Sequence, residues 1–355
     1  MAQRSHATAT TKVRRMTEGS AVLNQSRISA LDGLRGIAAL LVVAWHYLGA
    51  APGRYREIGE PVPHIIFAAN GVQLFFLISG FVIMMSLRKG TVRKFATARF
   101  IRLYPIYWIC VALTFALVSV FPLPEVHVSV GEAIINLTMV QSYLGFPHVD
   151  SVYWTLAIEL AFYVQAALLW SLGLLRGSRL LPTLAVWIVV SAIIGRFVPI
   201  ALETSPNLIF SGLHQAFDYI PLFVLGIVAL AVFEGRRDVK IWAVAALGLL
   251  AIVNMELVAN EGWAGILFFG LVLLVLMVSP LGTTSRPLIF LGEISYVLYL
   301  THQNLGYVVM RWLGGLGVPQ IATTTIALAL AIGVATLLTL VIDKPLRRLL
   351  RSKLL

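Results

Sequence analysis

Two side chains that can carry charge stand eleven positions apart in the first apolar run of the sequence. They are Arg35 and His46, and Asp32 precedes the histidine by fourteen positions. Eleven helical residues make about three turns and rise about 16 Å, so both side chains leave the same face, with Asp32 within about 40° of it. A neutral imidazole suits general-base catalysis, although a lone histidine is about as often a packing residue. The spacing therefore indicates a candidate site in which Arg35 and His46 lie on the same helix face, at two different depths in the membrane.

A carboxyl group lies well inside a second apolar run. Ser151, Thr155, Glu159 and Tyr163 recur at every fourth position, which places a polar stripe on one helix face. An unpaired carboxylate is strongly penalised in hydrocarbon, so Glu159 must be neutral, paired or in contact with water. We therefore expect Glu159 to have a chemical role.

Three further clusters interrupt apolar runs. Arg99 and Arg102 stand one turn apart and suit either ordinary membrane anchoring or the binding of an anion such as phosphate. Ser79 and its neighbour Gly80 are better explained by close helix packing. In the sequence "ISYVLYLTHQN", residues 294–304, helical spacing aligns Ser295, Tyr299 and His302, and an interfacial aromatic belt explains the tyrosines but not His302.

These side chains must be positioned by membrane helices. The 355-residue chain is 59% hydrophobic and 12% charged, against about 25% charged in a typical soluble domain. A membrane helix needs about 20 mostly apolar residues. The sequence therefore predicts an all-α, polytopic helix bundle of about ten spans, near residues 31–50, 70–87, 103–121, 153–175, 181–200, 215–233, 241–258, 263–280, 288–309 and 320–342.

Basic residues set the expected orientation. With ten spans, all 27 lysines and arginines except Arg54, Arg56, Arg196 and Arg311 fall on one face, which the positive-inside rule makes cytosolic, together with both termini. The same rule accounts for the net charge of +11 without a nucleic-acid partner. The lone Cys110 permits no intrachain disulfide and is expected to be a buried packing residue.

The chain is expected to divide into three parts. Residues 1–26 form a flexible cytosolic arm, 27–348 the membrane domain and 349–355 a short basic cytosolic tail. Arg99 and Arg102 are placed in the cytosolic connection before the third span, with Pro105 in that span's first turn. Residues 122–151 form the longest non-helical segment, on the external side, which is either a cover for a site or a passive connector.

Several blocks together resemble the membrane-bound acyltransferase 3 family of bacterial O-acyltransferases, over residues 28–348. The pattern of Arg35, ten residues, then His46 is similar to the family's opening motif. Five more blocks follow in the family's order: "FFLISGF" from Phe75, "RFIRLYPIY" from Arg99, "WTLAIEL" from Trp154, "YVLYLTH" from Tyr296 and "DKP" from Asp343. The chain ends a dozen residues after Asp343 and resembles the stand-alone form, which lacks a soluble hydrolase-like domain.

The resemblance implies transfer of an acyl group, most often acetyl, from acyl-coenzyme A to a hydroxyl, in the bacterial cytoplasmic (inner) membrane and without a metal. The acceptors that it implies are lipopolysaccharide sugars, exopolysaccharides and macrolides. The expected roles are catalysis by His46, Glu159 and Arg35; donor binding by Arg35, Arg99 and Arg102; and acceptor or oxyanion contacts by Ser79, Tyr299, His302, Asp32 and Trp154.

Two alternatives stay open. His46 is either a general base or a covalent carrier of the acyl group, and Glu159 either orients that histidine or holds the acceptor hydroxyl. The competing class is a proton-coupled transporter, which also keeps ionisable groups within a helix bundle. The sequence shows no repeated halves of the kind that many transporters have. A non-catalytic scaffold fits poorly with several ionisable groups in hydrocarbon.

Overall fold

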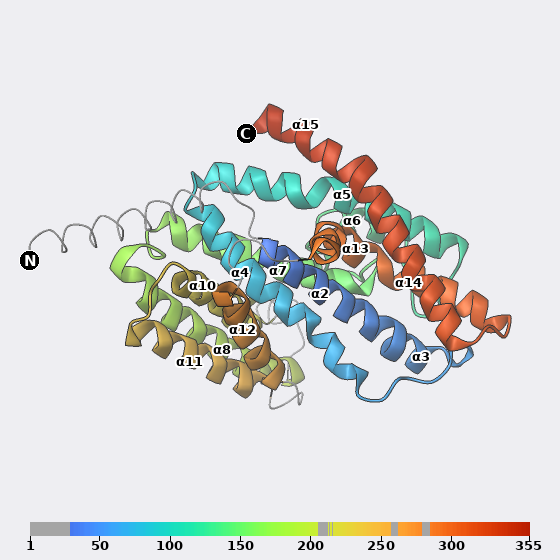
Figure 1. The fold of residues 1–355 in the computed structure, drawn as a ribbon, viewed down its shortest axis with the longest axis horizontal. Coiled ribbons are helices and arrows are strands. Elements are labelled where there is room, and N and C mark those ends of the chain that lie inside the picture. The colour runs from blue at the N-terminus through green and yellow to red at the C-terminus, as the bar shows by residue number, and fades with distance from the viewer. Residues whose placement is uncertain (1–28, 205–211, 213, 215, 257–261, 279–284) are drawn as a thin grey trace, which may run out of the picture.

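The chain folds as a bundle of helices (Figure 1). The computed structural model describes residues 29–204, 212, 214, 216–256, 262–278 and 285–355, and no strand occurs among them. The expected arm, residues 1–26, lies outside the described residues. The principal helices are α2 (Ser29–Trp45), α4 (Gly71–Leu87), α5 (Val92–Val120), α7 (Trp154–Ser171), α8 (Leu180–Thr204), α10 (Ile220–Phe233), α11 (Val239–Glu256), α12 (Gly262–Val278), α13 (Arg286–Gly315) and α14 (Gln320–Leu337).

Every expected span coincides with one of these helices, but only some have the length and composition of a membrane span. Among the described residues, six stretches qualify: 29–54, 65–87, 92–120, 151–171, 177–195 and 320–354. The apolar helices at 220–233, 239–253 and 263–277 are shorter, and α13 is long but carries polar residues throughout. Large apolar side chains also face outward, such as Leu168 at 57% exposure, as expected of a multi-pass membrane protein. The count of ten and the side of the termini stay predictions.

The helices form two groups that meet along α4. In Figure 1, α8, α10, α11 and α12 lie together at one side of α4, whereas α2, α13, α14 and α5 lie at the other. Helix α4 contacts α10 and α2, and α7 packs on α4 as well. The candidate residues of the sequence therefore come mainly from the second group and its boundary.

Glycines bring α2 and α13 into close contact. A Cβ atom on Gly292 would lie 2.0 Å from the Asp32 carbonyl oxygen, and one on Gly36 would lie 2.8 Å from the Leu291 Cβ. Farther along the pair, a Cβ on Gly306 would lie 2.2 Å from the Tyr47 ring. Small residues at three levels thus let the two backbones approach, which is a common device in membrane bundles.

The packing role expected for Gly80 is confirmed. A Cβ atom on Gly80 would lie 1.9 Å from the Phe223 carbonyl oxygen, and one on Gly226 would lie 2.0 Å from the Leu77 carbonyl oxygen. Helices α4 and α10 therefore pack through reciprocal glycines. This contact fixes the helix that carries Ser79.

The expectation that Arg99, Arg102 and Pro105 belong to a connection and the first turn of a span is wrong. Helix α5 already begins at Val92, where the Thr91 side chain accepts a hydrogen bond from the Lys94 N–H. Both arginines therefore lie inside the helix, and Pro105 lies in its interior. Because proline there removes only one backbone donor, the surrounding bundle tolerates it.

The segment 122–151, which we expected on the external side, is more ordered than a loop. It contains helix α6 (Val130–Asn136), which starts with a reciprocal capping box between Ser129 and Glu132. Asp150 is 1% exposed and accepts hydrogen bonds from the N–H groups of Val152 and Asn304. The expectation of a non-helical segment is thus corrected, and the hydrogen bond from Asn304 to Asp150 ties the segment to α13.

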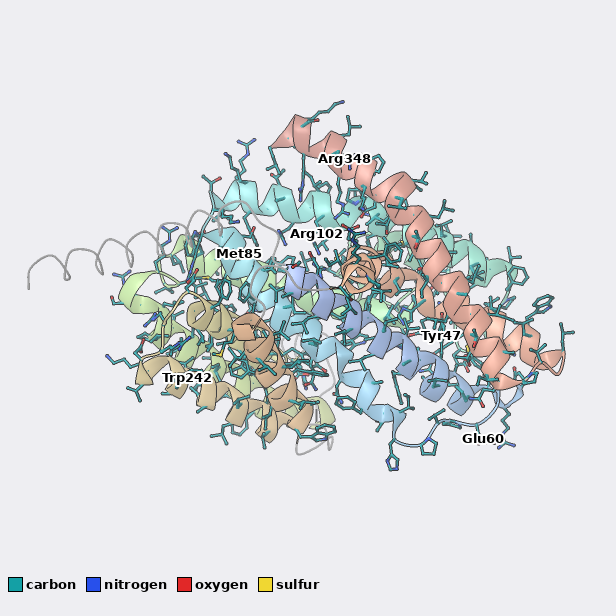
Figure 2. The ribbon with its side chains drawn as sticks, viewed as in Figure 1. Tyr47, Glu60, Met85, Arg102, Trp242 and Arg348 are labelled. Carbon is teal, nitrogen blue, oxygen red and sulfur yellow. The ribbon has the colours of Figure 1, made fainter. Side chains whose placement is uncertain are left out.

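The C-terminal residues continue the last span. A π-helical stretch, Leu338–Asp343, joins α14 to helix α15 (Lys344–Leu354), so residues 349–354 belong to a helix. Helix α15 lies beside α5 (Figure 1). Figure 2 places Arg348 of α15 and Arg102 of α5 toward the same side of the molecule and Glu60 toward the opposite side.

Candidate functional site

A cavity of about 60 Å³, lined by apolar side chains together with several charged and hydroxyl groups, lies among α2, α4, α5, α7 and α13. Arg35, Arg99, Arg102, Ser79 and Glu159 all line it, although they come from four helices. Tyr299 of α13 lines it as well, so the structure brings six of the candidate residues together at this cavity. Apolar side chains of α4 complete the wall.

Glu159 is a paired carboxylate. Its Oε1 atom accepts hydrogen bonds of 2.5 Å from the Ser79 hydroxyl and 2.5 Å from the Tyr163 phenol. Arg35 and Arg99 interact with it electrostatically. Two donors and two nearby cations meet the requirement that a carboxylate inside a membrane domain be partnered.

A larger basic cavity of about 450 Å³ adjoins the first. Arg35 and Arg102 line both cavities, as do Ser295 and Tyr296. Helix α15 contributes four more cations to the larger cavity: Lys344, Arg347, Arg348 and Arg351.

Two carboxylates accompany these cations. Glu293 Oε2 lies 2.7 Å from Lys344 Nζ, and Asp343 pairs with Arg347 one turn away. Six basic side chains against two acidic ones leave a net positive lining. Such a lining suits a ligand with several phosphate groups.

His46 lies at the other end of the α2–α13 contact. It starts a π-helical turn, His46–Ala50, that follows α2, and its Nδ1 atom is 2.9 Å from the Tyr307 hydroxyl. Its ring meets the His302 ring edge-on, with centroids 5.1 Å apart. The imidazole thus packs against α13. Arg35 and His46 do share one helix stripe, since each faces α13 at its own level.

The His302 side chain is fully buried with a defined tautomer. Its Nδ1 atom lies 3.0 Å from the carbonyl oxygens of Leu298 and Tyr299, so Nδ1 carries the proton and donates. Nε2 then holds a lone pair, and this buried atom has no hydrogen-bond partner in the structure. In this form Nε2 accepts rather than donates, which argues against the oxyanion role that we expected for His302.

Tyr299 lies between the smaller cavity, of about 60 Å³, and the pair of histidines formed by His46 and His302. Its side chain lines the smaller cavity, and its ring centroid is 5.9 Å from that of His302. Its hydroxyl is 2.7 Å from the Thr155 hydroxyl and donates to the Val152 carbonyl oxygen at 3.0 Å. One residue therefore touches both halves of the candidate site.

Two expected residues lie apart from the cavities. Trp154 is 36% exposed and packs against Tyr219, with ring centroids 5.6 Å apart. Asp32 is 7% exposed where α2 meets Gly292 of α13, and it interacts electrostatically with Arg35. Neither residue lines the two cavities, although Asp32 supports the arginine that does.

Sequence reasoning also missed several residues. Tyr307 shares helical spacing with Gln303 and Arg311, but this spacing does not mark it as the partner of His46, which lies 261 residues away. The sequence assigns the arginines of α15 to membrane orientation, and only the path of the chain through the π-helical stretch Leu338–Asp343 places them in the lining that contains Arg35 and Arg102. Cys110 is buried, as expected.

No cluster of three or more metal-ligating side chains occurs among the described residues. The side chains at the candidate site carry imidazole, carboxylate, phenol and guanidinium groups.

Comparisons with known proteins give the chain a family. A model of the acyltransferase domain matches residues 28–342. The acyltransferase MdmB of Streptomyces mycarofaciens is 30% identical over an alignment of 365 positions. The alignment covers 91% of this chain and 92% of that protein.

A putative acetyltransferase, ORF330, of Acidianus two-tailed virus is 28% identical over 76% of this chain and 80% of its own length. Protein 2 in the picA locus of Rhizobium radiobacter is 36% identical over 24% of this chain and 44% of its own length. No solved structure matches the chain significantly. With the family model spanning nearly all of the described helices, the chain belongs to the acyltransferase 3 family and is an acyltransferase.

Proposed function

We propose that the protein transfers a short acyl group, most simply acetyl, from acyl-coenzyme A to a hydroxyl of a glycan or macrolide-like acceptor. The observation that carries this proposal is the basic cavity of about 450 Å³, which adjoins the cavity containing Glu159. Coenzyme A carries three phosphate groups, and arginines bind phosphate through charge-assisted, often bidentate hydrogen bonds. The cations of α15 join Arg35 and Arg102 in this role, and Arg99 adds charge at the smaller cavity.

The proposed donor path runs from the basic cavity toward α4. The smaller cavity, of about 60 Å³, has room for a group of a few heavy atoms, which favours acetyl over a long acyl chain. Arg35 lines both cavities and faces the Glu159 carboxylate. Arg35 would therefore bind acyl-coenzyme A between its phosphate groups and its acyl group.

His46 is the proposed general base. Its Nδ1 is engaged with Tyr307, so Nε2 is the nitrogen that would take the proton from the acceptor hydroxyl. The hydroxyl oxygen then forms a bond to the thioester carbon, the carbon–sulfur bond breaks, and the proton passes from the imidazolium to the thiolate of coenzyme A. The products are an ester and free coenzyme A, and the histidine returns to its neutral state.

This reaction requires the acyl carbon to pass from the smaller cavity to His46 and His302. The path would run past Tyr299, which contacts both places. The hydroxyl groups of Ser79 and Tyr299 are the proposed donors to the oxyanion of the tetrahedral intermediate. Each is engaged elsewhere in the present structure, Ser79 with Glu159 and Tyr299 with Val152. Each would therefore exchange that partner for the substrate.

The proposed setting is a bacterial cytoplasmic membrane, with the donor bound from the cytosol. The side of the basic cavity supports this placement, because arginine and lysine concentrate on cytosolic faces. An acceptor arriving from the external side would reach His46 near Tyr55 and the segment 122–150.

Thiol release provides the test. The full chain in lipid nanodiscs is incubated with acetyl-coenzyme A and candidate sugars or macrolides, and free thiol and acylated product are measured together. His46→Ala should lower turnover by at least about 100-fold without changing the melting temperature. His127→Ala, which alters an exposed histidine of the external segment, is the matched control and should retain activity.

Near wild-type turnover in His46→Ala would remove the proposed base. Movement of an acceptor across the membrane without thiol release would identify a carrier instead. A covalent acyl-histidine would show itself as acyl-labelled protein in the absence of acceptor, and that label would disappear in His46→Ala.

A further inference from the structure

We propose that Tyr307 is a positioning residue that fixes the tautomer of His46, and that Tyr55 and Glu125 hold this tyrosine from the outer side. The inference rests on the proposed role of His46 as the base and names the residues that prepare it. None of the three lies in the sequence blocks that resemble the family.

The first contact is the hydrogen bond between His46 Nδ1 and the Tyr307 hydroxyl, at 2.9 Å. Tyr307 is 1% exposed, and its ring lies 6.1 Å from the imidazole between centroids. Because the phenol oxygen stands at Nδ1, a proton on Nδ1 has an acceptor there. The other nitrogen, Nε2, is then left with the lone pair that a general base requires.

This tautomer needs support from the protein. A neutral imidazole in water favours the proton on Nε2, and in that form Nε2 cannot accept a proton from a hydroxyl. An oriented acceptor at Nδ1 reverses the preference, in the way that a carboxylate sets the tautomer of the histidine in the Ser-His-Asp triad. The Tyr307 hydroxyl can accept from Nδ1–H or donate to an unprotonated Nδ1, and we assign it the accepting role, which leaves Nε2 as the base.

The second contact holds Tyr307 in place. The Tyr55 ring meets the Tyr307 ring edge-on, with centroids 5.7 Å apart, and Tyr55 donates a 2.6 Å hydrogen bond to Glu125 Oε2. The Arg311 guanidinium covers the Tyr55 ring at 4.7 Å. Arg311 in turn forms a 2.7 Å ion pair with Glu57. A cluster of aromatic and charged groups thus encloses the outer side of Tyr307.

These contacts join segments that are far apart in the sequence. Glu125 belongs to the external segment, 70 residues from Tyr55, and Tyr307 lies on α13, 261 residues from His46. The external segment is therefore part of the support of the proposed base. Burial and the hydrogen bond to Glu125 raise the pKa of Tyr55, so its phenol stays protonated and remains a donor to the carboxylate.

The tautomer can be measured without any assay of activity. The full chain, labelled with nitrogen-15 at its histidine side chains and held in nanodiscs, gives nitrogen shifts that distinguish protonated from unprotonated ring nitrogens. The His46 signals are assigned by their loss in His46→Ala. We expect Nδ1–H in the wild type and a shift toward Nε2–H in Tyr307→Phe, which keeps the ring and removes the hydroxyl.

Kinetics provide the second readout. Tyr307→Phe should lower kcat at least about tenfold while leaving the KM for acetyl-coenzyme A within about twofold. Tyr153→Phe is the matched control, because it also removes a buried phenol hydrogen bond, to the Leu300 carbonyl oxygen of α13. It should change neither kcat nor the His46 signals. If Tyr307 had a merely structural role, Tyr307→Phe would behave like the control Tyr153→Phe. Both would change the melting temperature, and neither would change the tautomer of His46.

Tyr55→Phe and Glu125→Ala test the outer support. Each should lower kcat by a smaller factor, and the double variant should be no worse than either alone, because both remove the same hydrogen bond. Unchanged kcat in both, or additive losses, would exclude Tyr55 and Glu125 from the inference.

Wild-type shifts and wild-type kcat in Tyr307→Phe, together with an inactive His46→Ala, would overturn this inference and leave the proposed function intact. An active His46→Ala would overturn the proposed function, whatever the tautomer shows.

Discussion

Ser79 and Glu159, 80 residues apart in sequence, share a hydrogen bond of 2.5 Å at the inner cavity. Tyr163 donates a second bond of 2.5 Å to the same carboxylate oxygen, and the charges of Arg35 and Arg99 act on the carboxylate. Glu159 therefore organises the polar groups of the smaller cavity, whereas the partners of His46 are Tyr307 and His302. Of the two roles expected for Glu159, orienting the histidine is the one that this geometry disfavours.

Replacing Glu159 by glutamine should lower kcat by about 100-fold, because the neutral amide no longer balances the two arginines at the reacting group. The measurement is thiol release from acetyl-coenzyme A at saturating donor. Glu234→Gln, which alters a surface ion pair with Arg88, is the control and should keep full activity. Normal turnover in Glu159→Gln would remove Glu159 from the site.

Arg351→Ala should raise the KM for acetyl-coenzyme A by about tenfold with little change in kcat, because one charge-assisted contact to phosphate is lost. The wild-type KM should also rise with salt, and less steeply in the variant. Lys353→Ala removes a cation from the same helix but not from the lining of the basic cavity, so its KM should stay near that of the wild type. Equal effects of the two variants would indicate general surface charge instead of a binding site.

Gly292→Ala should destabilise the protein by about 1–3 kcal/mol or more, because the new methyl group would overlap the Asp32 carbonyl oxygen. The check is the melting temperature in nanodiscs. Gly333→Ala on α14 offers a matched control, since a Cβ there meets no atom within 4 Å. It should be neutral or slightly stabilising, because alanine favours a helix more than glycine does. A normal melting temperature in Gly292→Ala would mean that α2 and α13 separate easily.

Stability should fall as the pH drops from about 6.5 toward 4, because of His148 in the external segment. Burial lowers the pKa of His148 to about 4, whereas the unfolded chain takes up that proton near the ordinary pKa of about 6.5. The stabilisation is therefore complete above pH 6.5 and lost on acidification, by up to about 3 kcal/mol.

His148→Gln should flatten this part of the curve of melting temperature against pH. The hydrogen bond between His148 Nδ1 and Gln141, at 2.7 Å, involves the neutral ring, so the variant should also be less stable than the wild type at pH 7.5. An unchanged pH dependence in His148→Gln would assign the effect to other groups.

The sequence predicts the helical fold well because hydrophobic runs and basic flanks are local signals. It also selects Arg35, His46 and Glu159 as candidates, since polar groups in apolar runs stand out against their neighbours. It misplaces the start of α5, because Thr91 caps a helix whose first turns are too polar to be recognised as part of a span. The sequence does not predict which residues from distant segments contact these candidates.

Tyr307 illustrates this limit. A tyrosine near the end of an apolar run looks like a member of an interfacial aromatic belt, and only the packing of α2 on α13 turns its hydroxyl toward His46. The arginines of α15 follow the same rule: their number is evident from the sequence, but their position over Arg35 depends on the path of the chain after α14. Propensity and periodicity hold no information on such tertiary contacts.

The three glycine contacts between α2 and α13 have a mechanical consequence. Since no methyl group fits at Gly36, Gly292 or Gly306, we expect α13 to move together with α2 and the π-helical turn that follows it. Arg35 at one end and His46 at the other are then held at a constant separation during turnover. Any hinge motion that admits or releases substrates must come from the neighbouring helices, and the distance that the acyl group travels is set by the substrates and not by sliding of this pair.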